Sequence, residues 1–376
     1  MLTSPGMSPD LKRALALVAA VAMVGAAVII RSSVFGDETD GGGNGRDDSA
    51  GPARLVCVTE LEGACHDLAD RLGDDISITV EDAGATAARL LNAATGNATG
   101  IDGWLTLSPW PKMIEDSRAR SNARPILGAV SEPVARSPLV MVVRTDRAEA
   151  LTPRCPDRNL GWRCLGDFAG RPWAELGGEA TWGSVKLAHA DAAGSASGAL
   201  LVAQAVGHYL ATPEIPVTAI SRIDWESSDG FASWFQHLEG AVPRNGFDPP
   251  AGSPFAQFLQ GRFVEYDAVA ALEAEVAPAL ARASGLGDSV VVAYPEPVGT
   301  ADVVFVSLLG SEGSARLVEV ATGSEGSSAL AAAGWRVDGE ARAAGVADSP
   351  PLPNGNGLPS AGAIDALRAL WEEVTR

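Results

Sequence analysis

The sequence predicts an α/β protein with two lobes. Short apolar stretches with strand character alternate with helical stretches through the first third of the chain, which is the pattern of a parallel sheet flanked by helices. Two longer apolar strands, 137–144 and 289–295, stand far apart in the chain and bracket an inserted α/β block. This bracketing predicts two lobes joined by a hinge of two chain segments.

The predicted division of the chain follows from these strands. Lobe 1 comprises residues 53–136 and 297–345, and lobe 2 comprises residues 137–296. A proline-rich segment then leads into an amphipathic helix, so residues 346–376 are treated as a linker followed by a C-terminal helix. The sequence contains no internal repeat.

The chain begins with a segment that has the features of a membrane anchor. Residues 14–30 form an uninterrupted apolar run of 17, with Lys12 and Arg13 before it and Arg31 after it. Such a run belongs to a signal peptide or to a signal anchor. No site of the Ala-x-Ala type and no cysteine follows closely, so we expect an uncleaved, single-pass transmembrane helix in residues 1–35, with the main domain extracellular.

Acidic residues dominate the remainder of the chain. Residues 36–52 combine aspartates and glycines with little to bury, which predicts a flexible linker. The whole chain has a formal net charge of −19. Nucleic acid needs a basic footprint, so this charge argues against nucleic acid as a partner. A local group of backbone N–H donors can still hold an anion at close range.

The first lobe begins with three strands that have helices between them. Strands are expected at 54–59, 76–80 and 103–107, and helices at 65–72 and 87–95. In open sheets of this kind, ligands bind beyond the carboxyl ends of the strands. The residues that follow the three strands are therefore candidate ligand contacts: Thr59, Glu60, Gly84, Ala85, Thr86, Ser108 and Trp110.

The four cysteines fall into two local pairs, Cys57 with Cys65 and Cys155 with Cys164. Outside the cell, an even number of cysteines at short spacing predicts disulfides. Closing each of these short loops should add about 2–3 kcal/mol of stability in the chain-entropy picture. Zinc is the alternative, but the chain has no Cys-x-x-Cys and its histidines have no ligand spacing to the cysteines. We therefore expect no metal and no cofactor.

The stretch 183–205 carries the most distinctive pattern. It reads as a buried strand, a loop of small and hydroxyl residues, and then an alanine-rich helix. This order places free backbone N–H groups beside Ser195, Ala196 and Ser197 at a helix N-terminus, where an oxyanion or a polar small molecule is held well. The alternative is that Ser197 only caps the helix.

The same loop nearly matches the Gly-x-Ser-x-Gly turn of serine hydrolases. The central position is Ala196 rather than serine, which removes the nucleophile from its expected place. His189 and Asp191 are close in sequence, but nothing in the sequence brings them to a serine. A serine hydrolase is thus the lesser alternative, and we expect no enzymatic activity.

Four segments together resemble a known family. They are Ser137-Pro-Leu-Val-Met-Val-Val143, Ala192-Ala-Gly-Ser-Ala-Ser-Gly198, Glu265-Tyr-Asp-Ala-Val269 and Val291-Val-Ala-Tyr-Pro-Glu-Pro297. In their order and spacing the chain resembles type 2 periplasmic (extracellular) solute-binding proteins, the receptor components of ABC importers, and most of all the branch of molybdate and sulfate binders. The richness in Ala, Gly and Arg suggests a high-GC, actinobacterial genome.

The resemblance implies a cleft that closes around a small solute and presents it to an ABC permease. It also implies a monomer, a hinge near Ser137 and Tyr294, and a ligand contact from Tyr266, for which packing beneath lobe 2 is the equal alternative. Glu60 and Glu62 depart from the family, since carboxylates beside the cleft would repel an oxyanion. The alternative function is a degenerate solute-binding fold that serves as an extracellular interaction or sensory module.

Overall fold

The computed structural model describes residues 51–243, 253–260, 265–283, 287, 289–337, 345–346 and 349–375. The expected membrane anchor and nearly all of the acidic linker lie outside these residues. Within the described residues, no helix is both long and apolar enough to cross a membrane.

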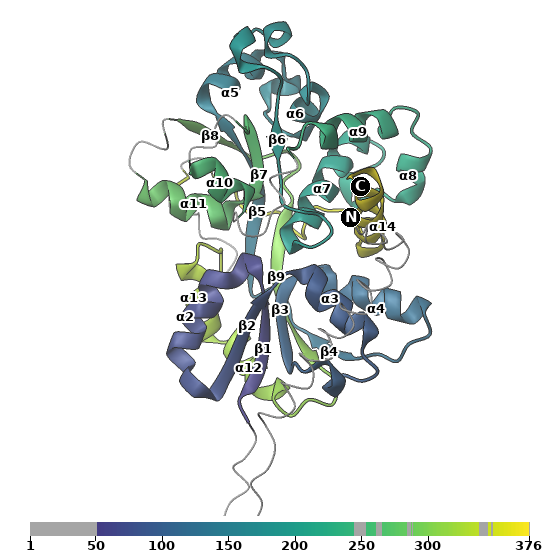
Figure 1. The fold of residues 1–376 in the computed structure, drawn as a ribbon, viewed down its shortest axis with the longest axis vertical. Helices are drawn as coiled ribbons and strands as arrows, with labels where there is room; N and C mark the ends of the chain where they lie inside the picture. Colours follow the sequence, from purple (N-terminus) through teal and green to yellow (C-terminus); the bar gives the residue numbers. More distant parts are fainter. Residues whose placement is uncertain are drawn as a thin grey trace, which may run out of the picture. The chain divides into compact units, whose positions relative to one another are not determined.

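The described residues form a nine-stranded sheet in the order β2-β1-β3-β9-β5-β7-β6, with β4 pairing with β9 and β8 pairing with β5 (Figure 1). The strands are β1 Ala53–Val58, β2 Ile76–Glu81, β3 Gly103–Ser108, β4 Leu127–Val130, β5 Ala135–Arg144, β6 Leu187–Ala188, β7 Ala268–Leu272, β8 Val290–Ala293 and β9 Thr300–Leu308. Every strand expected in the first lobe is present within one or two residues of its predicted bounds.

The directions of the strands correct the prediction of a parallel sheet. β1 pairs in parallel with β2 and β3, as expected. β9, however, pairs antiparallel with β3 and with β5, and β7 and β8 pair antiparallel with β5. The sheet is therefore mixed. An apolar run predicts that a strand is buried, but it carries no information about the direction of its neighbours.

One strand belongs to both halves of the sheet. Residues 135–138 of β5 pair with β9, and residues 139–143 pair with β7. The chain passes back from β8 to β9 through residues 294–299. We call the part around β1, β2, β3, β4 and β9 lobe 1, and the part around β6, β7 and β8 lobe 2. Two chain segments thus join the lobes beside one another in the sheet.

Helices cover each lobe separately (Figure 1). Lobe 1 carries α2 Glu62–Leu72, α3 Ala83–Asn92, α4 Trp110–Arg120, α12 Ser314–Thr322 and α13 Ser324–Ala332. Lobe 2 carries α5 Thr145–Leu151, α6 Trp162–Phe168, α7 Ala196–Leu210, α8 Arg222–Glu226, α9 Phe231–Gly240, α10 Pro254–Leu259 and α11 Glu273–Arg282. A final helix, α14, spans Ala361–Thr375.

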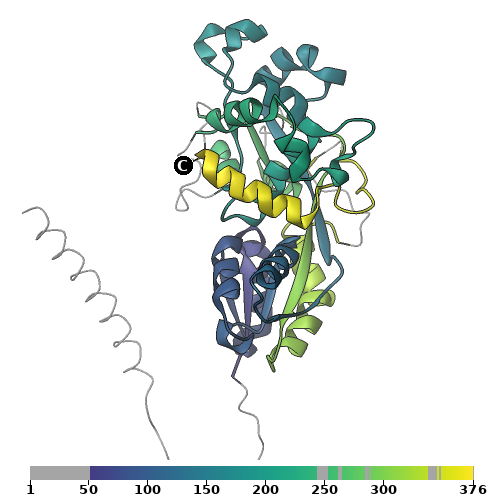
Figure 2. The same ribbon diagram turned by 90° about the vertical axis from the view of Figure 1, so that its right-hand side faces the viewer.

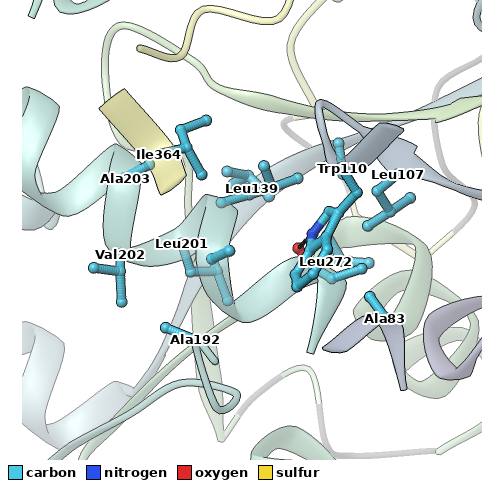
Figure 3. Packing of buried hydrophobic residues seen from close by; sticks show 14 of the residues in the cluster. Ala83, Leu107, Trp110, Leu139, Ala192, Leu201, Val202, Ala203, Leu272 and Ile364 are labelled. Carbon is cyan, nitrogen blue, oxygen red and sulfur yellow. Dashed lines mark hydrogen bonds between the residues drawn. The ribbon is translucent and has the colours of Figure 1, made fainter. Parts of the chain in front are cut away.

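The hydrophobic core continues from one lobe into the other. Figure 3 shows side chains of one buried cluster at this junction, among them Leu107 and Trp110 of lobe 1, Leu201 and Leu272 of lobe 2, and Ile364 of α14. α7 is buried along nearly its whole length, which suits a helix whose small and aliphatic residues leave no polar face. Apolar burial therefore stabilises the lobe junction as well as each lobe.

The C-terminal helix packs on both lobes. α14 contacts α7, α8 and α9 of lobe 2 and α4 of lobe 1, and Figure 2 shows it in yellow. Its apolar stripe is buried, and the indole of Trp371 donates to Glu239 of lobe 2 at 2.7 Å. On the other side, Arg120 of α4 pairs with Asp365 at 2.9 Å. The predicted amphipathic helix is thus a strap across the two lobes.

Both predicted disulfides are present. Cys57 is bonded to Cys65, and Cys155 to Cys164. The first joins the end of β1 to α2 of lobe 1, and the second lies in lobe 2 before and within α6. Local cysteine spacing alone was enough to predict the pairing.

Candidate functional site

A cavity of about 1080 Å³ lies between the lobes. Lobe 1 contributes the short 3₁₀ turn η1 (Thr59–Leu61), the start of α2, the end of β2 and the helix α13. Lobe 2 contributes the loop before α7, the start of α10, β7 and α11. This is the edge at which β1 and β2 end, so the cavity lies where ligands bind in open α/β sheets.

The turn that carries Glu60 is held by a covalent link. Cys57 precedes it on β1, Cys65 follows it on α2, and both sulfurs are fully buried. The disulfide closes a loop with a sequence separation of 8, which leaves η1 little freedom to move relative to the sheet. Glu60 is thereby presented towards lobe 2.

The N-terminus of α7 is the most ordered polar part of the cavity wall. Ser195 is the N-cap, since its Oγ accepts from the N–H of Gly198 at 3.0 Å. The alternative that Ser197 caps the helix is therefore wrong, because the cap lies two residues earlier. The loop before the cap is held by Asp191, whose main-chain oxygen accepts from the Ser195 N–H at 2.9 Å and whose Oδ1 accepts from Ala193 at 2.7 Å.

A carboxylate from lobe 1 occupies this helix N-terminus. Oε1 of Glu60 accepts from the Ser195 hydroxyl at 2.7 Å and from the Ser197 N–H at 2.7 Å. The Ser195 and Ser197 hydroxyls lie 3.0 Å apart, so Ser197 can donate to Ser195. The Ser195 hydroxyl and the Ser197 N–H, two of the donors predicted for a solute anion at this end, are thus directed at Glu60, and the Gly198 N–H is used within the loop. The negative charge also interacts favourably with the dipole of the helix.

Two further contacts join the lobes beside Glu60. The Gly84 N–H donates to the Gly194 carbonyl at 2.8 Å, and the Trp110 indole donates to the Ala196 carbonyl at 3.3 Å. A Cβ at Gly84 would lie 2.9 Å from the Ala193 carbonyl oxygen and 3.0 Å from the Gly194 Cα. The approach of the two backbones therefore requires glycine at position 84.

The predicted contacts divide into two groups. Thr59, Glu60, Ala85, Ser195 and Ser197 line the cavity, whereas Gly84, Thr86, Ser108, Trp110, Ala196 and Tyr266 do not. The expected loop 81–86 is largely helix, because α3 begins at Ala83 rather than at residue 87. The N–H groups of Ala85 and Thr86 accordingly donate to the Asp82 carbonyl instead of facing a solute.

Three predicted side chains have structural partners. Thr86 is fully buried and donates to Glu81 at 2.7 Å. Trp110 is 1% exposed and lies in the core at the lobe junction. Tyr266 is fully buried, and its hydroxyl donates to Gln257 at 3.2 Å, so the alternative of packing within lobe 2 describes it. In each case tertiary packing covers a residue that follows a strand end.

The serine hydrolase alternative finds no support in the position of His189. The ring is buried, with Nδ1 2.8 Å from the Ala190 carbonyl and Nε2 3.4 Å from Glu239. Burial is the largest single influence and lowers the pKa of His189, but the Glu239 carboxylate, the Ala190 carbonyl and the charge of Asp191 together raise it overall. The histidine thus belongs to the contact between lobe 2 and α14.

Sequence reasoning missed most of the acidic residues that line the cavity. Besides Glu60, the described lining contains Glu62, Asp67, Glu81, Asp82, Asp191 and Glu275. Asp67 pairs with Arg71 and Glu81 with Arg89. The run Glu81-Asp82 after the second strand was a local signal of this chemistry. Glu275 had no such signal, because it lies near the start of α11 more than 200 residues from Glu60.

These carboxylates influence one another. Partial loss of hydration raises the pKa of Asp82, the hydroxyl of Thr59 opposes this, and the charges of Glu60, Asp191 and Glu81 raise it further. Burial raises the pKa of Glu275 to about 7, against the hydrogen bond from Ser253 and with the help of Glu60. Among the described residues, no group of three His, Cys, Asp or Glu side chains is placed to hold a metal ion.

A second cavity, of about 960 Å³, lies between α8, α9 and α14. Its walls include Trp225, Phe231, Phe235 and Trp371. It lies away from the ends of β1 and β2 and contains none of the predicted ligand contacts. The cavity between the lobes is therefore the candidate site.

Comparison with known proteins identifies the fold. No protein-family model matches the sequence, and no curated protein matches it. The periplasmic binding protein AfuA from Actinobacillus pleuropneumoniae, solved with exogenous fructose-6-phosphate bound, is 13% identical over 87% of this chain and 97% of that chain, with a TM-score of 0.52. Iron-bound HitA from Pseudomonas aeruginosa is 12% identical over 86% of this chain and 100% of that chain, with a TM-score of 0.51. The chain thus has the fold of periplasmic solute-binding proteins, as the resemblance implied, and the narrower likeness to molybdate and sulfate binders stays a prediction.

Proposed function

We propose that this chain is an extracellular solute-binding protein that captures a small polar solute between its lobes for an ABC-type importer. The observation that carries the proposal is the cavity of about 1080 Å³ at the ends of β1 and β2, walled by both lobes. The fold shared with AfuA and HitA, whose structures hold fructose-6-phosphate and iron, supports the same use of the cleft.

The mechanism is non-catalytic. The lobes turn about the two connecting segments, β5 near Ser137 and the return from Tyr294 to β9. Ser137 Oγ accepts from the Ala274 N–H at 3.0 Å, and the Tyr294 hydroxyl donates to Glu273, so both segments are tied to the start of α11. Opening separates Glu60 from Ser195 and admits the solute, and closing buries it.

The organisation of the protein at the cell surface belongs to the same proposal. A single-pass anchor in residues 1–35 tethers a monomeric extracellular domain, with lobe boundaries at 53–136 with 297–345 and at 137–296. An ABC permease would then recognise the closed form of the two lobes. The packing of α14 on both lobes supports a receptor whose two halves move as a linked pair.

Thermal unfolding of the full-length protein with a panel of solutes tests the proposal. The panel contains oxyanions, sugars, sugar phosphates, amino acids, amines and metal ions at matched ionic strength. A solute that binds the folded state adds about 2.7 kcal/mol of stability at about 100 times its Kd. We expect one class to raise the melting temperature. If no class raises it, the receptor proposal is wrong.

A degenerate, non-transporting module is the second candidate. Glu60 fills the N-terminus of α7 without any solute, and such self-closure is what a lobe-locked interaction module would need. This candidate predicts that no solute class in the panel stabilises the protein. The panel therefore separates the two functions.

A further inference from the structure

The N-terminus of α7 already holds one of the protein's own carboxylates. Oε1 of Glu60 takes both the Ser195 hydroxyl and the Ser197 N–H. Glu60 is tethered beside these donors by its disulfide-linked turn, so its effective concentration exceeds that of any dilute solute anion. A free oxyanion would have to displace Glu60 and then lie next to it. Like charges at such short range repel one another.

The carboxylate oxygens beside this end are incompletely satisfied. Thr59 Oγ1 lies 3.4 Å from Glu60 Oε2 and 3.2 Å from Asp82 Oδ1. A hydroxyl has one proton, so Thr59 can donate to only one of these two oxygens at a time. The other oxygen is left to accept a hydrogen bond from a group that enters the cavity.

The charges of the cavity are not balanced from within. In the described part of the chain, no Lys or Arg lies at ion-pair distance from Glu60, Asp82, Asp191 or Glu275, in contrast to the paired Glu81. The only basic residue in the described lining is Arg282, which is exposed. Because carboxylates from both lobes converge, each closing movement brings negative charges together unless a cation enters with it.

The rest of the wall is apolar and small. β7, α11 and α13 contribute mainly alanines, together with Leu272, Pro278 and Trp335. This surface suits an aliphatic chain, and the volume of about 1080 Å³ holds a molecule of many atoms rather than a bare ion. The described residues also form no cluster placed to hold a metal ion.

We propose that the cleft takes an aliphatic organic cation with two or more ammonium or guanidinium groups, and that Glu60 determines this specificity by filling the α7 N-terminus with the protein's own carboxylate. This inference rests on the proposed function and names its class of solute. Ammonium groups would bond Glu60 Oε2, Asp82 or Asp191 beside α7 and Glu275 on α11. The aliphatic chain between them would lie on the alanine-lined wall.

Isothermal titration calorimetry of the full-length protein tests the inference. The probes are spermidine, putrescine, L-arginine, sulfate, phosphate and Ca²⁺, in about 150 mM salt to screen nonspecific attraction. We expect at least one of the three organic cations to bind as one molecule per chain, and sulfate, phosphate and Ca²⁺ not to bind.

Substitutions in the cavity test which carboxylates hold the cation. The double variant Asp82→Asn with Glu275→Gln should bind the organic cation about tenfold more weakly or worse. Two control substitutions, Asp74→Asn on lobe 1 and Glu214→Gln on lobe 2, remove exposed carboxylates outside the cavity. They should change the affinity for the organic cation by less than about twofold.

Two substitutions of Glu60 separate the effect of its charge from the effect of its hydrogen bonds to the α7 N-terminus. Glu60→Ala empties the α7 N-terminus, so sulfate should bind this variant and the organic cation should bind about tenfold more weakly. Glu60→Gln keeps an oxygen that accepts from Ser195 and Ser197 but removes the charge. It should keep the fold, continue to exclude sulfate and lose affinity for the cation, and it serves if the alanine variant does not fold.

The outcomes distinguish this inference from the function beneath it. Binding of sulfate or phosphate to the unaltered protein without any organic cation would overturn the inference and leave the receptor function standing. Binding of Ca²⁺ alone would overturn it in the same way. If the Glu60→Ala variant folds but does not bind sulfate, Glu60 does not exclude anions from the α7 N-terminus and its proposed role is wrong. If neither these probes nor the wider solute panel bind, the receptor function fails as well.

Discussion

Two parts of the cleft wall, the N-terminus of α7 and the start of α11, differ in how their polar groups are matched. At the α7 end, Glu60 meets two donors of Ser195 and Ser197 at 2.7 Å, and little is left for a solute. Towards α11, Glu275 receives a hydrogen bond from Ser253 but has no described cationic partner. A serine-rich helix N-terminus therefore does not by itself define an anion site. The chemistry of the cleft depends on which segment of the chain reaches that terminus first.

Removing the disulfide beneath Glu60 should weaken the contact between Glu60 and the N-terminus of α7. Cys57→Ser with Cys65→Ser should lower the free energy of unfolding by about 2–3 kcal/mol, because the unfolded chain regains the entropy of the open loop. It should also free the η1 turn, so that Glu60 leaves α7 for part of the time and sulfate gains weak binding. Urea denaturation and sulfate titration measure the two effects.

The second disulfide provides a matched control. Cys155 and Cys164 have a sequence separation of 9, against 8 for the first pair, and neither lines the cavity. Cys155→Ser with Cys164→Ser should cost a similar free energy of unfolding and leave sulfate binding absent. Equal gains of sulfate binding in both double variants would contradict the role of the η1 turn.

A side chain at Gly84 should hold the lobes apart. Gly84→Ala places a Cβ 2.9 Å from the Ala193 carbonyl oxygen, so the contact between Gly84 and Gly194 must lengthen. We expect the free energy of unfolding to fall by about 1–3 kcal/mol, the usual range for overpacking a tight contact. Small-angle scattering should report a larger radius of gyration for the free protein. Gly63→Ala is the control, because its Cβ would lie 4.0 Å from Ala333, and it should leave the radius unchanged.

The affinity of the cavity for an organic cation should depend on pH around neutrality, because of Glu275. The pKa of Glu275 is raised to about 7 by burial, and the groups that act on it are Ser253 of α10 and Glu60 of η1; Arg282, on its own helix, also lines the cavity. An ammonium group binds the ionised form, so affinity for the organic cation should rise by several-fold, less than about tenfold, between pH 6 and 8. Glu275→Gln should flatten this dependence, and an unchanged slope in that variant would assign the titration to another group.

The free protein should show the opposite trend in stability. The folded-state pKa of Glu275 lies above the ordinary value of 4.5, so the folded state binds the proton more tightly than the unfolded state. This contribution to stability is fully present below about pH 4.5 and is lost as the pH rises through about 7. Measuring unfolding with and without the cation across this range compares the two effects directly.

Much of the fold could be predicted from local patterns. Apolar runs located the strands of lobe 1 and the long strand β5, and cysteine spacing located both disulfides. The bracketing strands also indicated two crossings between lobes. The starts of helices were predicted less accurately: α3 begins at Ala83, whereas the sequence predicts residue 87. Helix propensity contributes little free energy, and tertiary packing decides where a helix starts.

The sequence by itself determined the acidic character, the strands and helices, and the small-residue turn before α7, since each depends on composition or on short-range spacing. Only the tertiary structure decided that Glu60 meets Ser195 across 135 residues, that Trp110 is covered, and that β9 runs antiparallel between β3 and β5. These features depend on contacts between distant segments, and no local period encodes which distant group will satisfy a free donor. The serine loop that looks like a solute site in the sequence is therefore, in the folded protein, the place where one lobe holds the other.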